Sequence, residues 1–72
     1  MSYKFTAIIN KEKKWYVAHC VELGVTSQGK TINDAQKNLK EAVELYLEDN
    51  PKIKPYLSKE SSLITTFELQ YN

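Results

Sequence analysis

Two stretches near the N-terminus alternate between apolar and polar positions, which is the pattern of a β-strand with one buried side. In residues 3–10 the alternate positions on one side are apolar, namely Tyr3, Phe5, Ala7 and Ile9. Residues 15–22 alternate in the same way after a polar break at residues 11–14. Because a break of this length suits a hairpin loop, the pattern predicts a β-hairpin.

The second of these strands has two unlike sides. One side carries Tyr16, Ala18 and Cys20, and the other carries the bulkier Trp15 and Val17. Small residues let a helix approach a sheet closely, so we expect the Ala18 and Cys20 side to be covered. Trp15 and Val17 are then left on an uncovered side, where we expect self-association.

A short third strand is predicted at residues 25–28, after a turn at Gly24. Gly29 follows it, and we expect a positive φ there as the chain leaves the sheet. Thr31 is a suitable N-cap for a helix, and Asp34 three residues later completes an approximate capping box. Gly24, Gly29, Thr31 and Asp34 are therefore predicted to be structural turn and cap residues.

From Ile32 onward, apolar residues recur at the spacing of one helical face, at positions 32, 35, 39, 42, 43, 46 and 47. Asn50 and Pro51 are expected to end this helix. Residues 50–61 read as a connection, and residues 62–72 alternate as a final strand. The predicted fold class is α+β in the order β-β-β-α-β, with one antiparallel-rich sheet and one long helix on one face.

A chain of 72 residues corresponds to a single domain, residues 1–72, with a thin core. Small domains are commonly supported by disulfides, a metal or self-association. Cys20 is the single cysteine, so no disulfide forms within the chain. We therefore expect a homo-oligomer, a dimer or larger, and an edge strand of the sheet is a second possible contact.

Neither a metal nor a cofactor is expected. The best ligand types, His19 and Cys20, are adjacent on a strand and leave it by opposite faces, so they cannot converge on one ion. The same geometry excludes a Cys-His catalytic pair. A metal-dependent nuclease needs convergent carboxylates, and residues 3–10 contain none. We expect no enzyme activity.

The basic residues are ten lysines and no arginine, with a net charge of +1. Arginine is the side chain that reads guanine edges, so sequence-specific DNA binding is not expected. The apolar patch near the N-terminus, five residues between Lys4 and Lys11, is too short for the hydrophobic part of a signal peptide. No apolar run in the chain has the length of a membrane-spanning helix. The default expectation is a cytoplasmic protein without membrane contact.

Residues 16–48 carry motifs in fixed register: Tyr16, Glu22-Leu23-Gly24, Ser27-Gln28-Gly29-Lys30-Thr31, Asp34-Ala35 and Asn38-Leu39-Lys40-Glu41-Ala42. This combination resembles the N-terminal domain of the HicB-like antitoxin family of type II toxin–antitoxin systems. Val21 departs from the family, which commonly has proline there, and Lys30 often corresponds to an acidic residue. The motifs cover about half of the chain.

The resemblance implies a sheet that is related in part to the ribonuclease H and double-stranded-RNA-binding folds. It also implies that the chain binds a small HicA-type toxin, an mRNA-cleaving protein, and masks its active surface. Exposure and turn chemistry then point to Glu22, Leu23, Ser27 and Gln28 as toxin-contact residues. Family members often continue into a DNA-binding domain, and we expect none C-terminal to the last strand here.

Two other functions compete with this one. Residues 24–31, GVTSQGKT, match the phosphate-binding pattern G-x-x-x-x-G-K-[ST]. That motif needs a free loop after a parallel strand, and the strand-like alternation of residues 25–28 favours a structural joint instead. The third possibility is an orphan homodimeric scaffold without a toxin. Binding of phosphate or nucleic acid is the least favoured of these alternatives.

Overall fold

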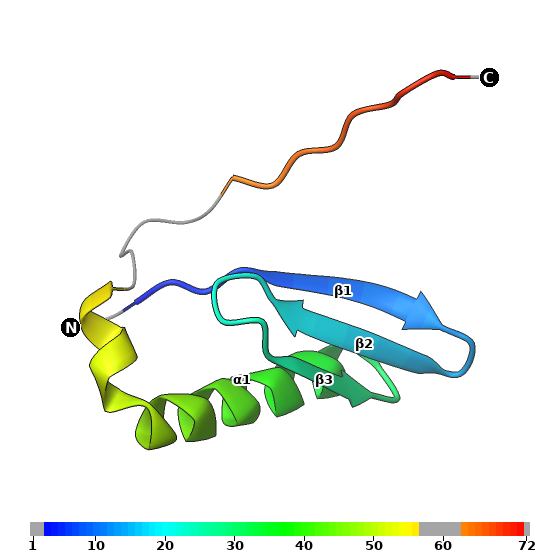
Figure 1. The fold of residues 1–72 in the computed structure, drawn as a ribbon. Coiled ribbons are helices and arrows are strands. Elements are labelled where there is room, and N and C mark those ends of the chain that lie inside the picture. Colours follow the sequence, from blue (N-terminus) through cyan, green and yellow to red (C-terminus); the bar gives the residue numbers. More distant parts are fainter. Residues whose placement is uncertain (1–2, 57–62, 72) are drawn as a thin grey trace.

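The computed structural model describes residues 3–56 and 63–71 of the chain. A three-stranded sheet is followed by one long α-helix and a short 3₁₀ helix (Figure 1). The elements are β1 (Ala7–Glu12), β2 (Trp15–Cys20), β3 (Thr26–Gly29), α1 (Ile32–Asp49) and η1 (Pro51–Tyr56). This arrangement confirms the predicted α+β class, a sheet with one long helix after it.

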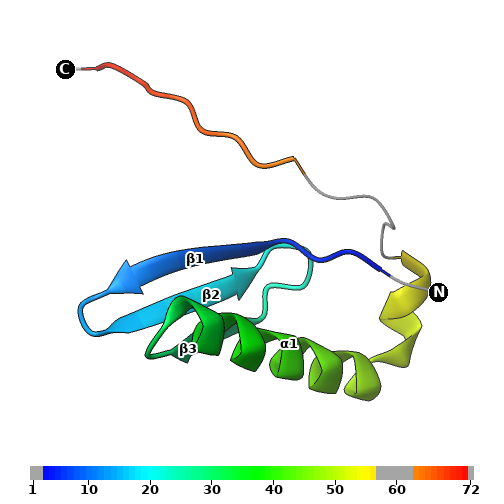
Figure 2. The ribbon, with the colours of Figure 1, turned by 180° about the vertical axis from the view of Figure 1, so that it is seen from behind.

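The sheet has the order β1-β2-β3, and both pairings are antiparallel (Figures 1 and 2). In the first pairing Ala7 lies opposite Cys20, and in the second Tyr16 lies opposite Gly29. β2 is therefore central, and β1 and β3 are the two edges of the described sheet. Directly opposed residues share a face, so the register assigns every strand residue to one side of the sheet.

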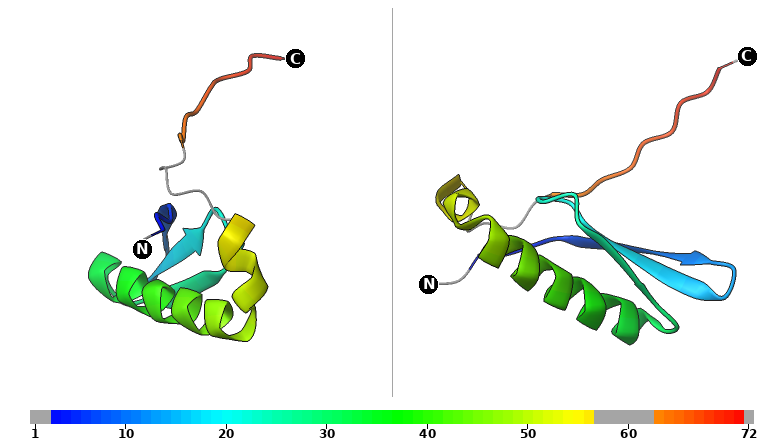
Figure 3. Two further views of the ribbon diagram at one scale, coloured as in Figure 1. Left: turned by 90° about the vertical axis from the view of Figure 1, so that its left-hand side faces the viewer. Right: turned by 60° about the horizontal axis from the view of Figure 1, so that its bottom comes forward.

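Helix α1 packs across one side of the sheet, as Figure 3 shows from two directions. The core lies between these two layers and consists of Ala18, Cys20, Ala35, Leu39 and Val43. Ala18 and Cys20 are small enough for the helix to come close, and both are almost fully buried. The covered side is thus the one that the small residues of β2 predicted.

Helix α1 begins after Thr31 and ends before Asn50, as the sequence predicted. The Thr31 hydroxyl accepts a hydrogen bond from the backbone N–H of Asp34 over 3.0 Å, which satisfies one free donor of the first turn. At the other end the Asn50 side-chain amide donates to the Tyr46 carbonyl over 2.9 Å. The predicted connection then starts with η1, and residues 57–61 of it lie outside the described residues.

The strand boundaries differ from the predicted ones by a few residues. β1 starts at Ala7 and includes Lys11 and Glu12, so the hairpin loop is only Lys13 and Lys14. Residue 13 has a φ of 53°, in the left-handed region that tight hairpin loops require. Polar character alone suggested a longer loop, whereas cross-strand pairing extends almost to the tip.

The predicted final strand is not part of the sheet. Residues 63–71 are extended but pair with no strand, and they lead away from the helix and sheet (Figures 1 and 3). The alternation of this segment predicted a strand, and the structure assigns no strand at residues 63–71. Alternation does not supply a partner, however, and no strand among the described residues pairs with this segment.

Candidate functional site

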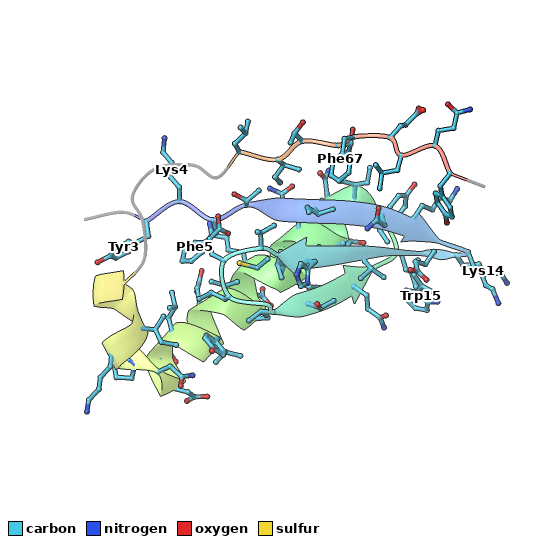
Figure 4. The ribbon with its side chains drawn as sticks, turned by 45° about the horizontal axis from the view of Figure 1, so that its top comes forward. Tyr3, Lys4, Phe5, Lys14, Trp15 and Phe67 are labelled. Atoms are coloured by element: carbon cyan, nitrogen blue, oxygen red, sulfur yellow. The ribbon has the colours of Figure 1, made fainter. Side chains whose placement is uncertain are left out.

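The side of the sheet opposite α1, here called the open face, carries the side chains that no helix covers. It consists of alternate residues of the strands, namely Ile8, Asn10, Glu12, Trp15, Val17, His19, Thr26 and Gln28. Trp15 is 43% exposed and projects from the hairpin end of β2 (Figure 4). Ile8 is also exposed, and Val21 is exposed immediately after β2.

The register brings together two residues that the sequence had assigned to different surfaces. Val17, predicted for self-association, lies directly opposite Gln28, predicted for toxin contact. Both side chains are therefore on the open face, together with Trp15. Ser27 lies opposite the buried Ala18 and so is on the helix side of the sheet. Among the predicted contact residues of the three strands, Ser27 is the one directed away from the open face.

Glu22 holds the turn after β2 against the start of β1. Its carboxylate accepts hydrogen bonds from the Thr6 backbone N–H and from the Thr6 hydroxyl, each over 2.7 Å. Charge-assisted bonds of this kind are among the stronger hydrogen bonds in proteins. Glu22 is partly buried, and its contacts give it a structural role in addition to any partner contact.

Leu23 also has a structural role, because it packs against the core cluster from the turn. The neighbouring Gly24 has a φ of +72°, the left-handed region that glycine adopts without strain. The backbone bond from the Gly24 N–H to the Cys20 carbonyl, 2.9 Å, closes this turn. The turn residues therefore shape the end of the sheet, and the partner surface centres on the open face beside them.

Gly29 is required for a different reason than the predicted one. Its φ is not in the left-handed region, so the expected positive φ was wrong. A Cβ at this position would instead meet the start of α1, at 2.7 Å from Asp34 C and 2.8 Å from Asp34 Cβ, and would also meet Ala35 N. Glycine is needed because the N-terminus of α1 packs directly against β3 and leaves no room for a Cβ.

A second contact holds the helix to this strand. The Asn38 side-chain amide donates to the Gln28 carbonyl over 2.8 Å. Residues 26–29 of the phosphate-loop pattern form β3, whose backbone pairs antiparallel with β2. A phosphate loop needs these amides free and directed at the ligand, so the geometry supports the structural joint.

The only histidine and the only cysteine of the chain point away from each other, as predicted for adjacent strand residues. His19 Nδ1 lies 2.9 Å from the Thr26 hydroxyl on the open face. Cys20 is buried under α1, and burial raises the pKa of its thiol above the ordinary value. A thiol with a raised pKa is a poor nucleophile near neutral pH, so Cys20 serves packing.

Within residues 3–56 and 63–71, no cluster of three or more histidine, cysteine, aspartate or glutamate side chains could hold a metal ion. The same residues contain no helix with the length and apolar character of a membrane span. The sequence had not singled out Ile8 as a site residue. Its place on the same face as Val17 and Trp15 follows only from the β1–β2 register.

An edge strand of the sheet was predicted as a second possible contact, but the groove beside the β1 edge was not predicted. There a groove of about 370 Å³ runs between β1 and α1, lined mainly by apolar side chains. No sequence motif marks it, because it arises from how far α1 extends across the sheet. The structure therefore offers two surfaces for macromolecular contact: the open face, and the β1 edge with its groove.

The chain is similar to known proteins at the level of sequence. A "UPF0150 protein" of Helicobacter pylori strain J99 is 40% identical over 67 residues, which cover 90% of this chain and 93% of the relative. No solved structure matches the chain significantly. Residues 4–61 match the sequence family described as "Family of unknown function (DUF7387)". Since this match covers most of its length, the chain belongs to that family.

Proposed function

We propose that this protein is an antitoxin-like protein that binds a small HicA-type mRNA-cleaving toxin and neutralises it by covering its active surface. The observation that carries the proposal is the open face, where Ile8 and Trp15 are exposed on one side of the sheet. An apolar patch of this kind on a small protein typically marks a contact surface. The motif resemblance of residues 16–48 to HicB-like antitoxins indicates the class of partner.

Such a mechanism needs a firm surface and no reactive group. The open face is firm because β2 is held by a strand on each side and by α1 beneath it. Gln28 adds a side-chain amide at the β3 edge of this face, so apolar and hydrogen-bonding contacts lie side by side. Interfaces commonly combine an aromatic anchor with surrounding polar groups, and Trp15 is the candidate anchor.

The test is a titration of purified partner, the product of the gene adjacent to this one, in an assay of mRNA cleavage. We expect cleavage to stop when the two proteins are equimolar, because masking is stoichiometric. Trp15→Lys is expected to abolish inhibition while the far-UV circular dichroism stays unchanged. Leu45→Lys is the matched control, since Leu45 is a 62% exposed apolar residue on α1. Cleavage that continues with wild-type protein in large excess would contradict the proposal.

The second candidate function is a homodimeric scaffold without a toxin. The exposed Trp15 and the half-buried Val17 beside it on β2 favour this function, because a second copy could cover the same face. In that case Trp15→Lys is expected to halve the molar mass of the protein measured by light scattering, and no toxin is expected to copurify with the wild-type protein. The cytoplasm is the proposed location for the antitoxin function, since the proposed toxin acts on mRNA there.

A further inference from the structure

Residues 63–71 have the composition of a strand but lack a partner in the single chain. Leu63, Phe67, Leu69 and Tyr71 alternate along the segment and are between 76% and 90% exposed. Phe67 projects from this segment in Figure 4. Large apolar side chains at every second position are typical of a strand with one buried side. Such a segment gains stability when a sheet edge and an apolar surface receive it together.

The outer edge of β1 has free backbone groups. The Thr6 carbonyl accepts from the Val21 N–H over 2.9 Å, so even-numbered residues of this strand direct their backbone groups toward β2. Odd-numbered residues therefore direct theirs outward, and these are Ala7, Ile9 and Lys11. Because β1 is an edge of the described sheet, these groups form a template for one more strand.

The groove lies on the helix side of this same edge. Its apolar lining comes from Phe5 before β1, from Cys20, and from Leu39, Val43 and Leu47 of α1. A strand added outside β1 places every second side chain over this groove and its remaining side chains over the open face. The groove volume, about 370 Å³, is also within the range of ligand pockets. A small ligand, however, would leave the backbone groups of the edge unpaired.

We propose that residues 63–71 of a second copy of this chain pair with the β1 edge and insert Phe67 and Leu69 into the groove. The exchange is reciprocal, so two copies form a two-fold dimer in which each groove holds the partner's segment. The proposal concerns the β1 edge and its groove, which are separate from Trp15, the proposed anchor for the toxin. It therefore holds or fails independently of the proposed toxin.

The direction of the chain favours a second copy over the same chain. Leu47, near the end of α1, and Tyr3, before β1, line the same groove. A segment that follows α1 thus meets β1 at its beginning and runs parallel to it within one chain. Instead, residues 63–71 lead away from the sheet (Figures 1, 2 and 3). A segment from a second copy is free to run antiparallel, which is the more stable pairing.

The first test changes the segment. Phe67→Asp together with Leu69→Asp is expected to convert a dimer into a monomer in light scattering, because it removes the two apolar side chains that fill the apolar part of the groove and would bury carboxylates there. Thr66→Asp with Gln70→Asp is the matched control. It adds the same charge to the same segment on the opposite side of the strand, and the dimer is expected to persist. A wild-type monomer, or a Phe67 and Leu69 variant that remains dimeric, would overturn the proposal.

The second test changes the edge and distinguishes the two copies. Ala7→Pro removes an outward N–H and is tolerated on an edge strand, but it blocks addition of a further strand. We expect this variant to be monomeric. When it is mixed with the Phe67 and Leu69 variant, a heterodimer is expected. The Ala7→Pro chain supplies an intact segment, residues 63–71, and the other chain supplies an intact β1 edge to receive it. If the mixture stays monomeric, the segment does not pair between copies.

Amide hydrogen exchange of the wild-type protein provides a measurement without mutation. The outward amides of Ala7, Ile9 and Lys11 are expected to become protected as the protein concentration rises. The amides of Ile8 and Asn10 point toward β2 and are expected to be protected at every concentration. Outward amides that exchange rapidly in concentrated protein would refute strand addition. Protection that is independent of concentration would place the segment on its own chain and also refute the exchange.

Discussion

Replacing Gly29 with alanine is expected to destabilise the protein through a collision with the start of α1. The added Cβ would lie 2.7 Å from Asp34 C and 2.8 Å from Asp34 Cβ. These atoms belong to the helix and cannot rotate away, so the helix must shift on β3. Overpacking of this kind costs about 1–3 kcal/mol. A chain of 72 residues has a total stability of about 4–11 kcal/mol, so the loss is a substantial fraction.

Gly24 provides the matched comparison, because glycine is needed there for a left-handed backbone conformation and not because a Cβ would collide with a neighbour. Its φ is +72°, and no heavy atom lies within 4 Å of an added Cβ. Alanine there costs about 1–2 kcal/mol from the left-handed backbone alone. Asparagine tolerates that region better than alanine, so Gly24→Asn is expected to recover part of the loss. Gly29→Asn adds the same Cβ as alanine and is expected to recover nothing.

Urea unfolding followed by far-UV circular dichroism measures these differences at one fixed protein concentration. The fixed concentration matters because self-association adds to apparent stability. A Gly29→Ala variant within about 0.5 kcal/mol of wild type would show that helix and strand are not in close contact. Equal recovery by asparagine at both positions would show that the two glycines have the same role, contrary to this reasoning.

Three further predictions concern single side chains. Thr31→Ala removes the hydroxyl that caps α1 and is expected to cost about 1 kcal/mol in urea unfolding, with Thr31→Ser close to wild type. Lys13→Gly relieves a positive φ in the hairpin loop and is expected to raise stability by about 0.5–1 kcal/mol, seen as a higher urea midpoint. Burial raises the pKa of Cys20, so the folded protein keeps this proton above pH 9.0 while the unfolded chain releases it. The free energy of unfolding therefore falls as pH rises through that value, and Cys20→Ala is expected to remove this part of the slope.

The helix and its cap were predictable because their signals are local. The apolar stripe that begins at Ile32 and the Thr31 hydroxyl act within a few residues of each other, and the structure places both as expected. The covered side of β2 was predictable as well, because Ala18 and Cys20 are small enough for a helix to approach. These features depend on residue size, spacing and hydrogen-bonding groups, which a sequence displays directly.

The remaining features depend on contacts between distant residues. Glu22 was predicted as a partner-contact residue, yet its carboxylate holds Thr6, sixteen residues away. Gly29 was expected to provide a positive φ, and its actual constraint comes from Asp34 and Ala35 across a turn. The alternation of residues 63–71 indicated a strand, but the structure assigns no strand there, because a strand also needs a partner that no local pattern specifies. Register and packing decide such cases.

The most direct test of the antitoxin proposal is cell growth when the adjacent gene product is expressed with and without this protein. We expect that gene product alone to arrest growth, and co-expression of the wild-type chain to restore it. Trp15→Lys is expected to fail to restore growth, whereas Leu45→Lys succeeds. Growth arrest that wild-type protein does not relieve, or rescue that Trp15→Lys supports equally well, would contradict the account.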